Sequence, residues 1–171
     1  TCVGCHDPHS LEVRTDRCVE CHQGASTVAD LRNIRMMASR SRDYDGDGNT
    51  TEGIFFELEG LRNRLIAAIR AYATGEGFGA VCYSGALYPY WFKDSDGDGT
   101  CSTEEAAFPN RYATWTPRLV RAAYNYQVSL KDPGAFAHNA KYIIQLLHDA
   151  TNDIATAIGQ PALIGTSQRN D

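Results

Sequence analysis

The residues best suited to chemistry form two copies of one pattern near the start of the sequence. Residues 2–6 read C-V-G-C-H, and residues 18–22 read C-V-E-C-H. Two thiols on one turn can add to the two vinyl groups of a haem, and the histidine that follows then points at the iron. The repeat therefore predicts two c-type haems. The expected attachment residues are Cys2, Cys5, Cys18 and Cys21, with His6 and His22 as the proximal ligands.

A zinc site is the alternative interpretation, because two C-x-x-C pairs also supply the four thiolates of a tetrahedral site. Two observations favour haem. A histidine follows each pair directly, which a four-thiolate zinc site does not require. Residues 1–27 also contain few large apolar side chains, too few to enclose a core unless the cofactors supply it.

Three other histidines are candidates for the second axial position of each iron, which decides between electron carrier and catalyst. His9 cannot reach the far face of the iron of His6, because three residues extend at most about 10 Å. We therefore assign His9 to the iron of His22, and His138 to the iron of His6. His148 is the spare, turned roughly 80° from His138 around the expected helix. The alternatives are a solvated loop residue for His9 and a capping or core residue for His138.

Two acidic stretches, D-Y-D-G-D-G-N at residues 43–49 and D-S-D-G-D-G-T at residues 94–100, open like calcium loops. In the second stretch, Glu105 stands at position twelve, where a bidentate carboxylate closes the site. In the first, position twelve is Ile54, so Glu52 at position ten is the expected late ligand and Glu57 the alternative. The expected ligands of two calcium ions are Asp43, Asp45, Asp47, Asn49 and Glu52, and Asp94, Asp96, Asp98, Thr100 and Glu105.

A solvated acidic turn is the other interpretation of each stretch, but three aspartates within five residues repel one another unless a cation neutralises them. A structural role is expected for this calcium, because Met36 and Met37 are the only methionines and a sensor needs a Met-rich groove.

Cys82 and Cys101 are the two cysteines outside the haem motifs. An oxidising compartment, periplasmic or extracellular, would join them as a disulfide.

Apolar spacing and capping residues predict four helices, over residues 28–40, 53–73, 117–130 and 139–158. Strand signals are sparse, and residues 75–115 lack a regular period. The expected fold class is mainly α, with a haem-organised N-terminal segment, about four helices, irregular calcium-stabilised loops and little strand. We expect one compact domain, in which residues 1–27 bind the two haems and residues 28–171 form a helical, calcium-binding body.

The 171 residues carry 16 basic and 21 acidic side chains, a net charge of −5. Because the arginines are dispersed among the acids, no basic face for nucleic acid is expected. No apolar run approaches the roughly 20 residues of a membrane span. The N-terminus lacks the features of a signal peptide, so the sequence looks like a mature chain or a fragment.

The repeated haem motif with residues 7–9 (D-P-H), the acidic loop at residues 43–53 and the stretch D-P-G-A-F-A-H-N-A-K-Y at residues 132–142 resemble bacterial multihaem c-type cytochromes. The resemblance spans nearly the whole chain. It implies electron transfer in the periplasm or outside the cell, and a distal-ligand role for His138. Most members carry more haems. Two haems therefore imply a piece of a polyhaem chain or a protomer that stacks its haems with those of its copies.

The expected function is electron transfer by a dihaem c-type cytochrome with two bis-histidine, low-spin haems. The chain would be a protomer of an extracellular haem-conducting filament or part of a larger polyhaem cytochrome. Its partners would be redox proteins or extracellular acceptors, with self-association through haem contacts. It is not expected to be an enzyme, since closed irons leave no place for substrate. The alternatives are a small multihaem reductase with one open iron, and a calcium-dependent binding module.

Overall fold

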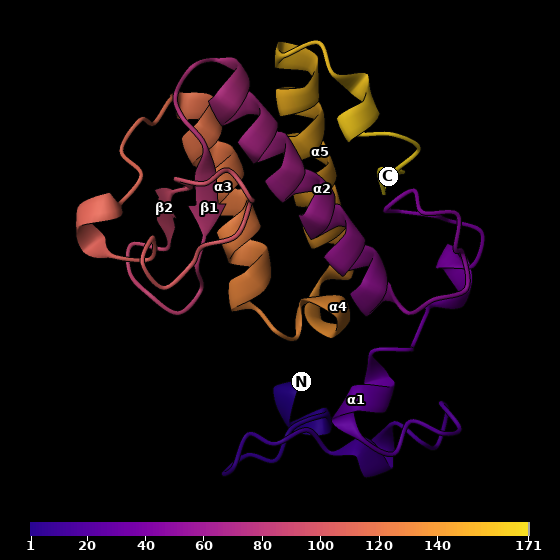
Figure 1. Cartoon of the computed structure of the whole chain (residues 1–171). Coiled ribbons are helices and arrows are strands. Elements are labelled where there is room, and N and C mark those ends of the chain that lie inside the picture. The colour runs from indigo at the N-terminus through magenta and orange to yellow at the C-terminus, as the bar shows by residue number, and fades with distance from the viewer. Residues whose placement is uncertain (171) are drawn as a thin grey trace.

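Three long helices form the body of the protein in the computed structural model, which describes residues 1–170 (Figure 1). They are α2 (Ile54–Gly75), α3 (Pro117–Lys131) and α5 (Ala140–Ala157), and the single-turn helix α4 (Ala135–His138) leads into α5. The mainly helical fold with little strand is confirmed. Within the described residues, no helix has the length and apolar character to cross a membrane.

Helix α2 lies at the centre of the core and packs against both α3 and α5. Its apolar residues recur every three or four positions, so they share one face of the helix. The start of α3 follows its capping signal, because the Thr116 hydroxyl accepts the N–H of Leu119 and Pro117 occupies the first turn. The fully buried leucines and isoleucines of the three helices are Leu58, Leu61, Leu65, Ile69, Leu119, Ile144, Leu147 and Ile154.

The irregular stretch between α2 and α3 contains a two-stranded antiparallel sheet, β1 (Val81–Tyr83) and β2 (Trp91–Lys93). Cys82 pairs with Phe92 across the strands, and both side chains are fully buried. The predicted disulfide between Cys82 and Cys101 is present. It ties β1 to the second acidic loop and so anchors a stretch that contains no α-helix.

The predicted helix over residues 28–40 is wrong in extent. Helix α1 (Val28–Leu31) starts at a capping box between Thr27 and Asp30 but lasts a single turn, and a separate 3-10 turn covers Met37–Ser39. The reason is a tertiary contact. The carbonyl of Ile34 accepts the N–H of Ile54 at 3.2 Å, which takes it out of any local helix.

The N-terminal segment lies beside the helical body, and α1 lies with that segment in Figure 1. The junction is close at Gly53, where an added Cβ would lie 1.9 Å from the carbonyl oxygen of Arg32. The Arg32 guanidinium also stacks on Phe55, 4.5 Å from the ring centroid, and Phe55 contacts Phe136 edge to face. These contacts attach the segment to the start of α2 and to α4.

The central position of α2 predicts a large cost for any cavity there. Replacing fully buried Leu61 by alanine should lower the free energy of unfolding by about 2–5 kcal/mol. The control is Val120→Ala on α3, because Val120 is 48% exposed and its truncation should change stability by no more than about 0.5 kcal/mol. Urea denaturation followed by circular dichroism measures both, and equal losses would contradict this account of the core.

Candidate haem and cation sites

The two C-x-x-C-H motifs adopt the same backbone turn. The N–H of His6 donates to the carbonyl of Cys2 at 2.9 Å, and the N–H of His22 donates to that of Cys18 at 2.8 Å. In such a turn, positions i, i+3 and i+4 share one face. Each turn therefore presents both thiols and its imidazole on one side. None of these four cysteines forms a disulfide; Cys18 is partly buried and the others are exposed.

The rings of His6 and His138 lie together, with centroids 6.2 Å apart and planes tilted by 49°. The Nδ1 atom of His6 is 2.8 Å from the carbonyl oxygen of Leu11, and that of His138 is 3.2 Å from the Asp132 carboxylate. Since each Nδ1 has a hydrogen-bond partner, Nε2 is the nitrogen left for another ligand. The structure thus brings together the two histidines that were assigned to one iron.

Within the described residues, the rings of the other three histidines make no contact with this pair. His9 is exposed, in a turn fixed by the Asp7 carboxylate, which accepts its backbone N–H at 2.9 Å. Within residues 1–170, the rings of His9 and His22 make no contact with each other, so their pairing stays a prediction. His22 lines a hollow of about 310 Å³ beside α1. His148 lies on α5, with its Nδ1 3.6 Å from the carboxylate of Asp149.

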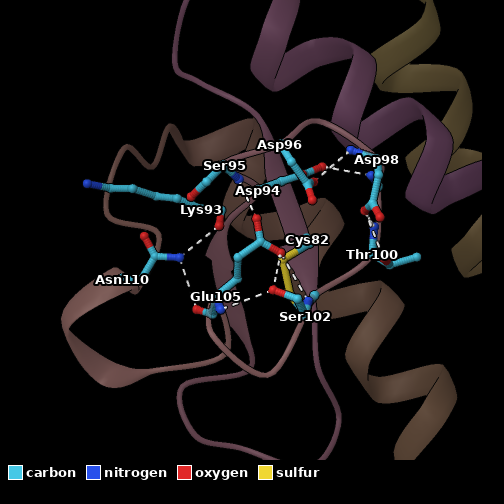
Figure 2. Close-up of a disulfide and its surroundings, with 12 residues drawn as sticks. Cys82, Lys93, Asp94, Ser95, Asp96, Asp98, Thr100, Ser102, Glu105 and Asn110 are labelled. Carbon is cyan, nitrogen blue, oxygen red and sulfur yellow. Dashed lines mark hydrogen bonds between the residues drawn. A yellow bond between two sulfur atoms is a disulfide. The ribbon is translucent and has the colours of Figure 1, made fainter.

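The second acidic loop has its predicted closing carboxylate in place (Figure 2). Glu105 accepts the N–H of Ser95 at 2.5 Å and that of Ser102 at 3.0 Å, and these bonds lower the pKa of Glu105. Carboxylate oxygens of Asp94, Asp96 and Glu105 all lie within 4.8 Å of one another. Of the other expected ligands, Asp98 accepts the N–H and hydroxyl of Thr100. The three carboxylates are close enough together to ligate one cation.

The first acidic loop contains two overlapping carboxylate groups. One consists of Asp45, Asp47 and Glu52, and the other of Asp43, Asp45 and Glu57. In each group, carboxylate oxygens of the three residues lie within 4.8 Å of one another. The expected ligand Asn49 caps the following turn, since its side-chain oxygen accepts the N–H of Thr51 at 3.1 Å. Both Glu52 and the alternative Glu57 therefore stand next to the aspartates.

Glu57 has the same structural role in the first loop as Glu105 in the second. It is fully buried and accepts the N–H of Tyr44, the second residue of its loop, at 2.7 Å. Arg35 pairs with the other oxygen of Glu57 and also bonds to the carbonyl of Ser39. Sequence reasoning missed Arg35, because no local pattern connects an arginine to a carboxylate 22 residues away.

Concentrated negative charge makes the first loop costly without a counter-ion. Burial, with the nearby carboxylates of Asp47, Glu57 and Asp43, raises the pKa of Asp45 to about 6. Burial and the charges of Asp45 and Asp47 raise the pKa of Glu52 to about 7, and its Oε1 atom is buried without a hydrogen-bond partner. A divalent cation would remove both penalties.

Comparison with known proteins finds relatives among cytochromes that carry several haems. Over 190 aligned positions and 92% of its length, the chain is 23% identical to the C-type polyheme cytochrome OmcB of Geobacter sulfurreducens and 25% identical to OmcC of the same species. The chain is a distant relative of c-type polyhaem cytochromes. It spans only 22% of OmcB and 21% of OmcC. No family model and no solved structure matches it.

The second loop offers a direct test of its closing carboxylate. Glu105→Gln removes the charge but keeps a side-chain amide of similar size, so calcium affinity at this loop should fall at least tenfold, about 1.4 kcal/mol. The matched control is Glu104→Gln, because Glu104 is the exposed neighbour. Calorimetric titration of the calcium-depleted protein measures both variants. Unchanged affinity in Glu105→Gln would contradict the assignment.

Proposed function

We propose that the chain is an electron-transfer unit of a polyhaem cytochrome, with two c-type haems that are each held by two histidines. The observation that carries the proposal is the pair of His6 and His138. These residues come from opposite ends of the chain, yet their rings lie 6.2 Å apart with both Nδ1 atoms already occupied.

The spacing of the two rings fits a shared metal. A bond between a metal and an imidazole nitrogen is about 2 Å long, and the ring centre lies about 1 Å further on, so two imidazoles on opposite sides of one metal have centroids about 6 Å apart. The observed 6.2 Å agrees with this estimate. His6 would be the proximal ligand and His138 the distal ligand. A haem bound there supplies a one-electron Fe(III)/Fe(II) couple.

The cysteines support haem over zinc. A tetrahedral zinc site needs four sulfurs at about 2.3 Å from one ion. Among the described residues, the groups of three or more side chains able to share a metal consist of carboxylates, and no cysteine belongs to them. Instead, each cysteine pair sits on its own turn with its own histidine. That arrangement suits two separate thioether attachments.

The second haem would be attached to Cys18 and Cys21, with His22 as its proximal ligand and His9 as its distal ligand. Support comes from the shared backbone turn of the two motifs and from the exposure of His9. The His6 and His9 positions are three residues apart, so the two haems would be close neighbours. Electron exchange between close haems requires no movement of the protein.

Two calcium ions would complete the structure, one in each acidic loop. The carboxylate groups, the partnerless Oε1 atom of Glu52 and the raised pKa of Asp45 support a cation in the first loop. The completed twelve-position pattern supports one in the second. The first loop also bonds to other parts of the chain. Arg64 bonds to the carbonyls of Asp45 and Gly46, and the Gly46 carbonyl also accepts the hydroxyl of Thr166 near the C-terminus.

The relatives support a larger context for the two haems. Their names describe polyhaem proteins, and this chain matches about a fifth of each. The unit would therefore exchange electrons with haems of adjoining segments or of other copies, and with redox proteins or extracellular acceptors. Covalent haems and the Cys82–Cys101 disulfide suit the periplasm or the cell exterior. Electron microscopy distinguishes filaments of copies from single particles.

Substitution of the distal ligand tests the haem assignment. In the wild-type holoprotein, absorption and paramagnetic resonance spectra should show two low-spin haems. His138→Ala should convert one of them to a high-spin form that binds cyanide, because one axial position becomes open. His148→Ala is the matched control and should leave both haems low-spin. A His138→Ala protein with two low-spin haems would contradict the ligand assignment. A wild-type iron that binds cyanide or nitrite would indicate the reductase instead.

Calcium removal tests the structural role of the acidic loops. A site with free calcium at 100 times its dissociation constant contributes about 2.7 kcal/mol to the stability of the folded state. Chelation should therefore lower the melting temperature measured by calorimetry while the haem spectrum stays the same. An unchanged melting temperature would argue against bound calcium, and a large shift of the haem potentials would argue against a purely structural role.

A further inference from the structure

We propose that Asp132 is a positioning residue that lowers the reduction potential of the haem held by His6 and His138, through its hydrogen bond to the distal imidazole. The inference rests on the proposed ligation of that haem. It concerns a carboxylate that plays no part in the haem motifs or the acidic loops. The observations that carry it are the contacts of Asp132, the space at Gly134 and the different partners of the two imidazoles.

One oxygen of Asp132 holds both the turn and the ring. Asp132 caps the C-terminus of α3, and its Oδ1 atom accepts the backbone N–H of Gly134 at 2.9 Å. The same atom lies 3.2 Å from Nδ1 of His138. The carboxylate is thus fixed by the backbone of the loop before it meets the imidazole. The ring of His138 in turn has one preferred direction at the end of α4.

Gly134 provides the space for this arrangement. A Cβ atom at this position would lie 2.5 Å from Cε1 and 2.9 Å from Nδ1 of His138, so the ring lies directly against the glycine backbone. The carbonyl of Gly134 also accepts the N–H of His138 at 2.8 Å. Any side chain here would push the imidazole away. The backbone from Asp132 to His138 therefore fixes the position of the His138 ring.

The two imidazoles of the pair have chemically different partners. Nδ1 of His6 faces the neutral carbonyl of Leu11 at 2.8 Å, whereas Nδ1 of His138 faces a carboxylate. An anionic acceptor draws the Nδ1 proton and makes the imidazole a stronger electron donor. A stronger donor stabilises Fe(III) relative to Fe(II), and the potential falls. The ammonium of the neighbouring Lys131 lies 4.5 Å from the centre of the Tyr90 ring. The guanidinium of Arg62 does interact with the charge of Asp132, so it offsets part of the effect of the carboxylate.

The expected effect is limited by solvent. The Asp132 side chain is 43% exposed and that of His138 is 57% exposed, so water screens part of the charge. We expect removal of the charge to change the one-electron equilibrium constant of this haem by up to about tenfold, which corresponds to ~59 mV. The other haem should keep its potential, because its proposed ligands His9 and His22 have no contact with Asp132.

The test is Asp132→Asn in the haem-loaded protein, with both potentials measured by spectroelectrochemical titration. Asparagine keeps a side-chain oxygen that can accept from Gly134, so the substitution removes mainly the charge. One potential should rise while both haems stay low-spin, and the near-infrared charge-transfer band of that ferric haem should shift. Asp132→Ser should move the potential in the same direction, which covers the case of a poorly folded asparagine variant.

The matched control is Asp153→Asn, which removes the same charge from a carboxylate of α5 that pairs with Arg118 of α3. It should leave both potentials unchanged. Equal shifts in the two variants, or unchanged potentials in both Asp132 variants, would overturn the inference. Failure of the ligation itself has a separate signature, since His138→Ala would then leave both haems low-spin whatever the Asp132 variants do.

Discussion

The N-terminal segment has too few apolar residues for a core of its own, so its order depends on contacts with the rest of the structure and on what it binds. Its large apolar side chains are largely exposed, among them Val3, Leu11 and Val19. Its order depends on backbone turns, on the junction at Gly53 and on the contact of His6 with α4. In the proposed function, the haems supply the apolar surface that a core of this segment needs. The helical body then serves as a support that holds one ligand in place.

The helices of the body form its apolar core, and its loops carry the clustered carboxylates. Helix α2 is buried along one face between α3 and α5, and this core needs no cofactor to explain it. The acidic loops instead concentrate carboxylates, and in the first loop the raised pKa values of Asp45 and Glu52 show that the protein alone does not remove their mutual repulsion. Glu57 illustrates the solution at the first loop, where Arg35 and two backbone N–H groups surround one buried charge. A cation would neutralise the remaining charges.

Local patterns in the sequence predicted most of what is local in the structure. The long helices, the cap at Thr116 and the disulfide follow from periodicity, capping rules and cysteine counting. The features that it missed depend on tertiary contacts. The helix expected over residues 28–40 ends early because Ile34 bonds to Ile54, and the importance of Glu57 depends on Arg35. In the same way, no spacing rule connects Asp132 to a haem, because its role arises only after the loop has folded.

The distance in sequence between His6 and His138 also sets an order of events during biogenesis. In the proposed function, haem attachment needs only the C-x-x-C-H turn at residues 2–6, which is synthesised before α4. The proposed distal ligand His138 belongs to α4, which follows the whole of α2 and α3. The first iron would therefore pass through a period with one axial side exposed to small molecules. Packing of α4 against the N-terminal segment would close it, so this cofactor would mature only after α4 has formed.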